Sequence, residues 1–294
     1  MVSERSLAEK IFDLCNIVLM FLLSILFIYP LYYCFAASIS NPEQLAATPG
    51  LIIWPVGFSV QAYESVFHNR MMLRGLLNSI FYVVAGTSVN ILMTSFAAYV
   101  LSRKGFYWKR FIFVVILITM YFSGGLIPTF ILVKDLRLTE TPWAMIIPGA
   151  INTFYMIIMR TYFLSIPVSM EESAVIDGAN DFQILFKIIF PLAMPVVAVM
   201  IIYYGVGHWN SWFSAMIYLI KNKEWQPLQL ILRDILNLNN TQSLTNLGDT
   251  LAAQRLGRLI RYALIMVTVT PIILIYPFMQ KHFVKGVMVG SIKE

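Results

Sequence analysis

The hydrophobic residues of this chain gather into six long runs, and shorter polar segments separate them. Each run contains about the 20 apolar residues that an α-helix needs to cross the hydrocarbon core of a bilayer. The runs are Ile17–Ile39, Leu76–Leu101, Phe111–Val133, Trp143–Phe163, Pro195–Ile220 and Tyr262–Met279. This pattern predicts an all-α polytopic membrane protein in which a single transmembrane domain, residues 1–294, contains six spans.

The first run has an alternative interpretation as a secretory signal, because Arg5 and Lys10 precede it. The run is longer than the apolar region of a signal peptide, and it contains Tyr29 and Pro30 near its end. We therefore expect the segment to be kept as a membrane span.

The composition agrees with a chain embedded in lipid. Hydrophobic residues make up 59% of the sequence and charged residues only 12%, so there are too few polar groups to cover a soluble domain of 294 residues. The net charge is +6, but no basic patch is interleaved with a soluble fold. Nucleic-acid binding is therefore a poor explanation of the charge.

The basic residues also bear on orientation. If both termini are cytoplasmic, eleven of the 21 Lys and Arg residues lie inside, so the total count decides little. The local density of basic residues says more about orientation, because four of them lie from Arg103 to Arg110 in the shortest connection. The positive-inside bias acts most strongly on short loops. We predict that this connection, the segment 165–191 and both termini are cytoplasmic.

A polar segment, Ser165–Pro195, separates the fourth and fifth runs. Ser169 and Glu172 have the spacing of a capping box, which predicts that a short helix begins there. Gly178 can end that helix in the left-handed conformation that a side chain would resist. The acidic residues of this helix are Glu171, Glu172 and Asp177.

Beyond the glycine, Asp181 is placed to cap a second short helix. An apolar face on this helix is predicted by three- and four-residue spacing of Phe182, Leu185, Phe186 and Ile189. Two short amphipathic helices that bend at a glycine can lie at the membrane surface and present an apolar face to a groove of another protein.

The same segment carries a longer pattern: E-A-A, three residues, G, nine residues, and I-x-L-P. Here it reads Glu172-Ser173-Ala174, then Gly178, then Ile188-Ile189-Phe190-Pro191, with mild departures at Ser173 and Phe190. The chain resembles the inner-membrane permease subunits of binding-protein-dependent ATP-binding cassette (ABC) importers. The similarity covers essentially the whole chain, and the stretches 209–219, 225–236 and 276–294 resemble the carbohydrate-importing branch.

The resemblance implies a multi-pass type I importer permease of the cytoplasmic (inner) membrane, which is a transport subunit and not an enzyme. The partners it implies are a second, homologous permease, two ABC subunits that bind ATP and Mg²⁺, and an extracytoplasmic solute-binding protein. The implied substrate is an oligosaccharide, including fragments of acidic polysaccharides such as alginate. The implied residues of the cytoplasmic coupling loop, 165–191, are Glu171, Glu172, Ala174, Asp177, Gly178 and Ala179.

The sequence lacks motifs for nucleotide and metal binding. It has no G-x-x-x-x-G-K-[ST] to hold ATP phosphates. His68, His208 and His282 lie in different segments without metal-ligand spacing. We therefore expect no cofactor and no metal in this chain.

The predicted spans offer almost no ionisable group that could couple transport to an ion gradient. Spans two to six contain no Asp or Glu, and His208 in the fifth span is the single candidate for a proton relay. A neutral histidine that is hydrogen-bonded inside a helix bundle is the commoner state. We expect energy to enter through the segment 165–191; the alternative is an ATP-independent secondary sugar transporter or facilitator.

A pathway for sugars should combine aromatic planes with amides and hydroxyls, because sugars have apolar ring faces and hydroxyl rims. The candidate lining residues are Asn152, Tyr155, Tyr203, Tyr204, His208, Trp209 and Asn210. The alternative is that the aromatic side chains belong to interfacial belts and that the polar groups bond between helices.

Two segments on the expected outer side, Ser40–Gly75 and Lys221–Arg261, are too long for simple turns. They can lie on the bilayer as interfacial helices, or they can receive the binding protein, as the resemblance implies. The second segment includes an asparagine-rich stretch, 237–246.

Overall fold

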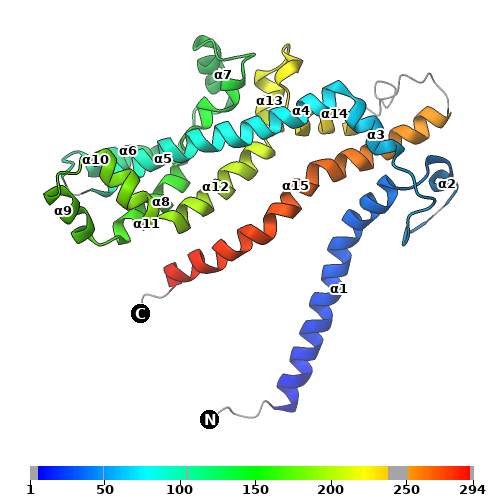
Figure 1. Ribbon diagram of the computed structural model, residues 1–294, viewed down its shortest axis with the longest axis horizontal. Helices are drawn as coiled ribbons and strands as arrows, with labels where there is room; N and C mark the ends of the chain where they lie inside the picture. Colours follow the sequence, from blue (N-terminus) through cyan, green and yellow to red (C-terminus); the bar gives the residue numbers. More distant parts are fainter. Residues whose placement is uncertain (1–5, 49, 104, 238–250, 292–294) are drawn as a thin grey trace. The chain divides into compact units, whose positions relative to one another are not determined.

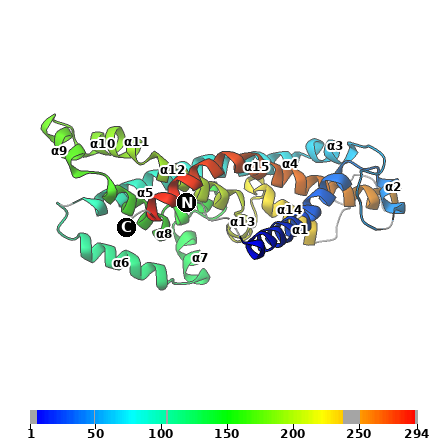
Figure 2. The ribbon, with the colours of Figure 1, turned by 90° about the horizontal axis from the view of Figure 1, so that it is seen from below.

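The computed structural model describes residues 6–48, 50–103, 105–237 and 251–291, with the side chains of 255–277 in the last range. The described residues are mainly helical, and their only strand-like pairing is an isolated bridge between Ser40 and Phe58. The all-α class predicted from the sequence is confirmed. The chain divides into two compact units, residues 1–70 with 235–269 and residues 71–234 with 270–294 (Figures 1 and 2). The single transmembrane domain stays a prediction.

The first unit contains the long helix α1, Leu7–Ser38. It begins ten residues before the first apolar run because Ser6 caps it. The Ser6 hydroxyl accepts a hydrogen bond from the Glu9 amide at 3.3 Å, and the Glu9 carboxylate accepts one from the Ser6 amide at 3.0 Å. Within this unit the apolar side chains of α1 are exposed along most of its length. Such a surface is suited to lipid or to another membrane subunit.

The segment 40–75 forms short helices rather than an extended loop. They are α2, Pro42–Ala47, and α3, Gln61–His68. The first part of α15, Leu251–Ser291, belongs to the same unit. A small core in this unit consists of Ala36, Ala37 and Ile52, against which Tyr32, Tyr33, Leu45 and Tyr262 pack. Residues 238–246 of the asparagine-rich stretch lie outside the described residues.

The helices from α4 to α14 make up most of the second unit. α4 (Arg70–Phe81), the π-helical turn η1 (Tyr82–Gly86) and α5 (Thr87–Ser102) form one continuous helix of 33 residues. The other helices are α6 Lys109–Tyr121, α7 Leu126–Asp135, η2 Pro142–Met145, η3 Ile147–Gly149, α8 Thr153–Ser165, α9 Val168–Ile176, α10 Asp181–Ile184, η4 Leu185–Ile189, α11 Phe190–Leu192, α12 Met194–Trp209, α13 Trp212–Tyr218, η5 Lys223–Trp225 and α14 Leu228–Asn237.

The lengths of the helices agree with membrane crossing. Among the described residues, three helices are long and apolar enough by themselves: residues 7–38, 70–102 and 255–277. The number rises to as many as six if each of three bent helix pairs is one span. The bends are 116° between α6 and α7, 52° before α8, and 86° between α11 and α12.

Glycine and proline explain where these pairs bend. Gly125 has a φ of 83° between α6 and α7, a conformation that a side chain would resist. Pro148 lies in η3 before α8, and Pro191 and Pro195 flank the junction of α11 and α12. The apolar runs are therefore continuous in hydrophobicity but not in helical geometry.

The largest core of the second unit joins α5, α8 and α12. Met156, Met159 and Met200 are fully buried in it. The polar segment after α8 is anchored to the same core through Ile184 and Leu185. This packing fixes the candidate coupling segment against the span bundle.

Two contacts mark the ends of the second unit. At one end the Arg103 guanidinium donates to the Glu171 carboxylate. At the other end the Glu140 carboxylate accepts a hydrogen bond from the Asn222 amide at 2.8 Å. The contact between Arg103 and Glu171 places the connection before α6 and the segment 165–191 at the same end of this unit.

Candidate coupling segment and translocation pathway

The helix α9 begins two residues earlier than the predicted capping box requires, at Val168. Pro167 is its N-cap, with a φ of −57°, and no side chain caps this end. Ser169 lies inside the first turn, where its carbonyl accepts a hydrogen bond from the Ser173 hydroxyl at 2.9 Å. The predicted Ser169–Glu172 capping box was wrong, because the proline already sets the direction of entry into the helix.

The end of α9 is the glycine hinge predicted from the sequence. Gly178 has a φ of 83°, its amide donates to the Val175 carbonyl at 3.0 Å, and the Ala179 amide donates to the Ala174 carbonyl at 2.9 Å. These two bonds define a Schellman motif. The left-handed glycine is confirmed.

The second short helix is capped by Asn180 and not by Asp181. The Asn180 side chain accepts a hydrogen bond from the Gln183 amide at 2.9 Å, and the Gln183 side chain accepts one from the Asn180 amide at 3.0 Å. Asp181 is the first residue of α10. The prediction was off by one residue, because both residues are good caps and only Asn180 has a capping partner at the right spacing.

The two faces of the coupling segment differ in exposure. Ala174 is buried against the core of the bundle. Glu172 and Asp177 are exposed. The large apolar side chains exposed beside them are Met170, Val175, Ile176 and Phe182. An apolar face with two carboxylates next to a hinge is a surface that can dock into a groove with basic groups on its rim.

Glu171 faces the other way. Its carboxylate binds the Arg103 guanidinium, and the side chains of Glu171 and Arg103 are only 19% and 17% exposed. The guanidinium carbon of Arg103 also lies 4.9 Å from the centre of the Tyr99 ring. Glu171 therefore ties the coupling segment to the end of α5.

The predicted pathway residues Tyr204 and His208 take part in a polar ladder between α12 and α5. His208 Nε2 lies 2.6 Å from Asn90 Oδ1, and the Tyr204 hydroxyl lies 2.8 Å from the Thr94 hydroxyl. Both partners are four residues apart on their helices, so the two bonds form successive rungs. The hydrogen-bonded histidine expected from the sequence is confirmed.

Both rungs also reach the broken fourth span. The Asn90 amide donates to the carbonyls of Gly149 at 2.6 Å and Ala150 at 3.0 Å. Because its nitrogen is used in this way, the Asn90 oxygen accepts from Nε2–H of His208. The Tyr204 hydroxyl accepts from the Asn152 amide at 3.1 Å. Where a helix is broken inside the membrane, some backbone groups lose their hydrogen bonds within the helix. Such groups need hydrogen-bond partners on neighbouring helices.

Three tyrosines form an aromatic cluster beside the ladder. Tyr155 and Tyr203 stack with ring centres 5.3 Å apart and planes 18° apart. Tyr155 and Tyr204 meet edge to face at 4.9 Å. Tyr204 is buried, whereas Tyr155 and Tyr203 are half-buried. These two rings are therefore the accessible aromatic planes of the cluster.

The remaining predicted lining residues lie at the end of α12. Trp209 is buried, and Asn210 is exposed. The Asn210 side-chain oxygen accepts a hydrogen bond from the Gln229 amide group at 3.3 Å. The seven predicted residues thus form a cluster of Asn152, Tyr155, Tyr203 and Tyr204, a neighbouring His208, and a separate pair at the helix end.

Sequence reasoning missed Asn90 and Thr94. A signal was present, because Asn90 and Thr94 are polar residues four positions apart in a mainly apolar run and so share one face of a helix. Asn90 is fully buried. A buried amide in a span requires hydrogen-bond partners on neighbouring helices.

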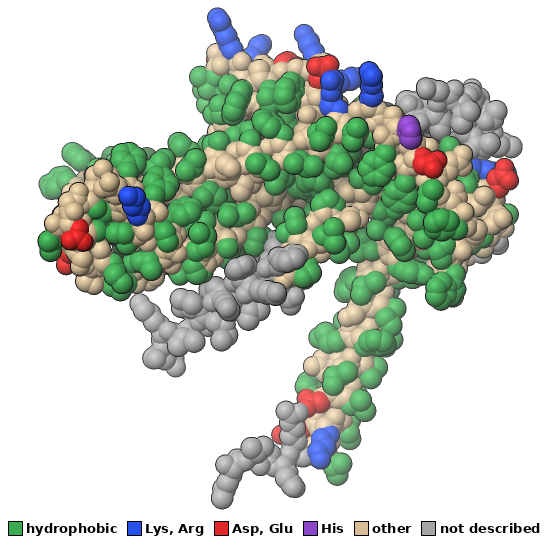
Figure 3. All heavy atoms as spheres, in the orientation of Figure 1, with side chains coloured by type: hydrophobic (Ala, Val, Ile, Leu, Met, Phe, Trp, Pro, Cys, Tyr) green, Lys and Arg blue, Asp and Glu red, His purple; other side chains and the backbone are tan. Residues whose placement is uncertain are grey.

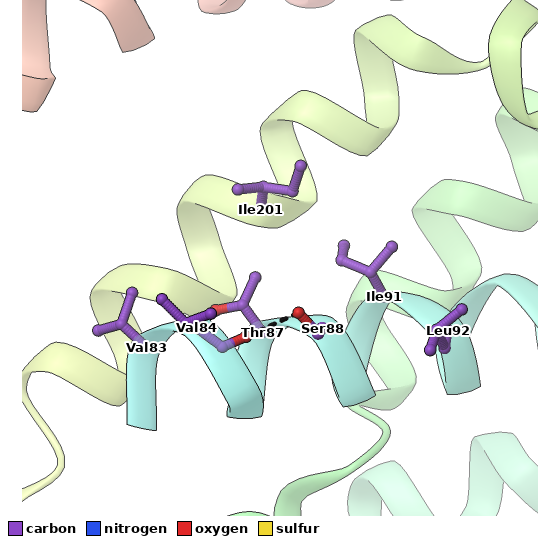
Figure 4. A pocket seen from close by; sticks show the side chains of 7 residues that line it. All are labelled: Val83, Val84, Thr87, Ser88, Ile91, Leu92 and Ile201. Carbon is purple, nitrogen blue, oxygen red and sulfur yellow. Dashed lines mark hydrogen bonds between the residues drawn. The ribbon is translucent and has the colours of Figure 1, made fainter. Parts of the chain in front are cut away.

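A hollow of about 530 Å³ opens on the face of α5 toward α12. Figure 4 shows Thr87, Ser88 and Ile201 among the residues that line it. The Ser88 hydroxyl donates to the Val84 carbonyl at 2.7 Å. The Thr87 hydroxyl is buried without a hydrogen-bond partner among the described residues. The hollow contains no charged side chain, so it is suited to neutral or apolar groups.

The match to a family model decides the identity. The model of the "binding-protein-dependent transport system inner membrane component" matches residues 90–289, which include most of α5 and all of α8, the coupling segment and α12. This chain belongs to that family. It is a membrane permease, a transport component that works with other subunits of an ABC import system and a binding protein.

Individual relatives agree with this assignment. The permease is 37% identical over 287 residues to the polygalacturonan/rhamnogalacturonan transport system permease protein YtcP of Bacillus subtilis, covering 97% of this chain and 99% of the relative. It is 38% identical over 287 residues to the protein LplC of the same organism, covering 97% and 96%.

A solved structure matches the whole fold of the permease. It is a chain in the crystal structure of a bacterial ABC transporter involved in the import of the acidic polysaccharide alginate. The TM-score is 0.87 and the sequence identity 33%, and the match covers 96% of this chain and 100% of that one. The resemblance expected from the motif of the coupling segment is confirmed at the level of family and fold.

Proposed function

We propose that this permease forms half of the translocation pathway of an ATP-driven importer for oligosaccharides. In this proposal the segment 165–191 transmits the movement of separate ATPase subunits to the spans, which alternate between inward-open and outward-open states. The observation that carries the proposal is the exposed face of α9, where Glu172 and Asp177 flank apolar side chains beside Gly178.

The division of roles within this segment follows from exposure. Glu172 and Asp177 would pair with basic groups on the rim of an ATPase groove, and Gly178 would provide the bend. Ala174 and Ala179 would let the segment approach closely. Glu171, implied by the resemblance as a coupling residue, would act indirectly by holding α9 to Arg103.

The proposed partners are a second, homologous permease, two ABC ATPase subunits that hold ATP and Mg²⁺, and an extracytoplasmic solute-binding protein. Membership in a binding-protein-dependent family supports the last of these. In this proposal the coupling segment and both termini are cytoplasmic. Arg103, Lys109 and Arg110 support this orientation, because they lie at the same end as the coupling segment.

The proposed substrates are oligosaccharides released from acidic polysaccharides. One relative is a polygalacturonan/rhamnogalacturonan permease, and the matching crystal structure is of an alginate importer. Within the pathway, the half-buried rings of Tyr155 and Tyr203 would contact sugar faces. Trp209 and Asn210 would contribute at the end of α12, whereas Tyr204, His208 and Asn152 would position the broken span.

A pair of substitutions at the hinge tests the coupling role. No atom lies within 4 Å of a Cβ built on Gly178, so a substitution there acts through the backbone. Valine strongly resists the left-handed conformation, whereas asparagine tolerates it. Gly178→Val should lower ATP-driven uptake into proteoliposomes on the order of tenfold while membrane insertion is kept, because local strain costs about 1–3 kcal/mol. Gly178→Asn is the matched control.

Equal uptake by the valine and asparagine variants would argue against a hinge role for this glycine. The substrate class needs a separate measurement. The permease should be copurified with its untagged partners, and the complex screened by thermal shift against acidic and neutral oligosaccharides. Stabilisation by neutral sugars alone would contradict the proposed substrates.

A further inference from the structure

Among the described residues, two that are not glycine adopt the left-handed backbone conformation: Arg137 with a φ of 57° and Glu140 with a φ of 63°. A side chain disfavours this conformation, so it persists only where surrounding contacts or a function require it. For Glu140 the contacts are evident. Its carboxylate accepts hydrogen bonds from the amides of Lys221 at 3.1 Å and Asn222 at 2.8 Å. Glu140 thus fastens the turn after α7 to the turn after α13.

Arg137 ends α7 at the position where helices favour glycine. Its amide donates to the Lys134 carbonyl at 2.9 Å, and the Leu138 amide donates to the Val133 carbonyl at 3.1 Å. These are the two bonds of a Schellman motif. α9 ends with the same pair of bonds, and there Gly178 holds the equivalent position. The chain therefore keeps an arginine where glycine would fit with less strain.

The side chain of Arg137 makes no contact with the described residues of this unit that would explain an arginine at this position. It is exposed, and no ion pair or side-chain hydrogen bond joins it to any described residue. Its backbone bonds would form equally well with glycine. Among the described residues, the Arg137 guanidinium is therefore available to bind a group outside this unit.

Three other exposed cations lie on the same two turns: Lys134, Lys221 and Lys223. The Glu140 contacts and a small core between α7 and α13 hold these turns together. We term Lys134, Arg137, Lys221 and Lys223 the basic tip. Figure 3 shows lysine and arginine side chains gathered along the upper edge, over α7 and α13.

Nearby acidic residues leave most of this charge uncompensated. Glu140 is engaged by backbone amides, and the Glu224 carboxylate accepts from the Arg74 guanidinium at 2.8 Å. Asp135 is exposed and has no ion pair among the described residues. The four cations of the basic tip thus face one uncommitted carboxylate.

We propose that the basic tip binds the carboxylates of an anionic oligosaccharide at the outer side of the membrane. This inference rests on the proposed function, which makes the end opposite the coupling segment the outer one. The guanidinium fork of arginine matches the geometry of a carboxylate. Cations spread over two turns suit a chain with one carboxylate on each of several successive sugar units.

The described residues of the proposed pathway offer no charged side chain to an anionic sugar. The described candidates, Tyr155, Tyr203, Trp209 and Asn210, carry no charge. A charged sugar would therefore meet complementary charge at the basic tip and not among these groups. The tip would raise the local concentration of an anionic substrate before it enters the pathway.

The test uses the assembled transporter with its partner subunits in nanodiscs of zwitterionic phosphatidylcholine. The probes are fluorescently labelled tetragalacturonate and its fully methyl-esterified, uncharged form, and binding is measured by fluorescence polarisation. The acid form should bind, and its affinity should fall as salt rises from roughly 0.05 to 0.5 M. Arg137→Gly should weaken its binding by roughly two- to fivefold, as expected for an exposed ion pair.

Two further variants make the result specific. The triple variant K134Q/K221Q/K223Q should weaken binding of the acid form further, and Lys10→Gln in α1 should leave it unchanged. Arg137→Gly should also keep or raise the melting temperature of the complex, because glycine relieves the strained backbone. Weaker binding without loss of stability excludes a merely structural role for Arg137.

Equal binding of the acid and ester forms, or unchanged binding by the glycine variant, would overturn the inference. An effect of the substitution that requires anionic phosphatidylglycerol in the bilayer would also overturn it, because it assigns the tip to lipid headgroups. ATP-driven uptake by the wild type is measured in parallel. Binding of the acid form without uptake would contradict the proposed function, but it would still support the inference that the basic tip binds carboxylates.

Discussion

His208 and Asn90 are joined by a hydrogen bond of 2.6 Å between Nε2 and Oδ1. The bond links α12 to α5, and through the Asn90 amide it also reaches the carbonyls of Gly149 and Ala150. One buried side chain therefore connects three of the candidate spans at the point where one of them is broken.

Replacing Asn90 by alanine should destabilise the permease. The carbonyls of Gly149 and Ala150 would lose their donor, and His208 would lose its acceptor. An unsatisfied buried polar group costs about 1–3 kcal/mol, so the melting temperature of the purified complex should fall. Ser88→Ala is the control, since the exposed Ser88 bonds only to its own helix. Equal stability of both variants would show that water or lipid replaces Asn90.

Gly86→Ala should also be destabilising. A Cβ on Gly86 would collide with the His208 ring, whereas a Cβ on Gly207 would meet no atom within 4 Å. Inserting a methyl group into a packed site costs about 1–3 kcal/mol. In contrast, Gly207→Ala should be neutral or slightly stabilising, because alanine favours helix more than glycine does. Thermal unfolding of the two variants side by side checks this, and equal shifts would contradict the close packing.

The contact between Arg103 and Glu171 predicts a pattern for charge substitutions. Both side chains are mostly buried, so removing one partner leaves a charge without compensation and should cost about 2 kcal/mol or more. Glu171→Gln and Arg103→Gln should each lower the melting temperature and weaken coupling between ATPase activity and uptake. The reversed pair R103E/E171R should recover part of the loss. Failure of the reversed pair to improve on either single variant would indicate that geometry, and not charge, holds this contact.

Neighbouring tyrosines of α12 should respond differently to substitution. Tyr204→Phe removes the hydroxyl that bonds to Thr94 and to the Asn152 amide, so it should lower stability by about 1 kcal/mol. Tyr203→Ala removes a half-buried ring that stacks on Tyr155. It should lower the uptake rate with a smaller effect on the melting temperature. If both variants lose uptake only in proportion to stability, Tyr203 has no role in the pathway.

The fold was largely predictable because the length of an apolar run is a strong signal for a membrane-spanning helix. Six apolar runs predicted an all-α membrane protein, and the described helices include three complete candidate spans and three bent pairs. The bends were not predicted. Gly125 and Pro148 are residues of the kind at which helices can break, but whether a helix bends there depends on tertiary contacts such as those of Asn90.

In the coupling segment, sequence reasoning located the glycine correctly but misplaced the two helix caps by two residues and by one residue. Gly178 was predicted correctly because a left-handed helix end strongly favours glycine. The two caps were misplaced because another residue one or two positions earlier can also begin the helix. Pro167 displaced Ser169, and Asn180 displaced Asp181. The burial of Glu171 against Arg103 could not be predicted from local sequence, because the two residues are 68 positions apart.

The π-helical turn at residues 82–86 has a consequence for how the helix from Arg70 to Ser102 is used. In a regular α-helix each residue turns the chain by about 100°, so one residue fewer in this turn would swing Asn90 and Thr94 away from α12. Asn78, before the turn, would keep its hydrogen bonds to the backbone of Glu224 and Gln226. A single-residue deletion within 82–86 should therefore uncouple the two halves of this helix: the half before the turn would stay anchored, while the half after it would lose its partners.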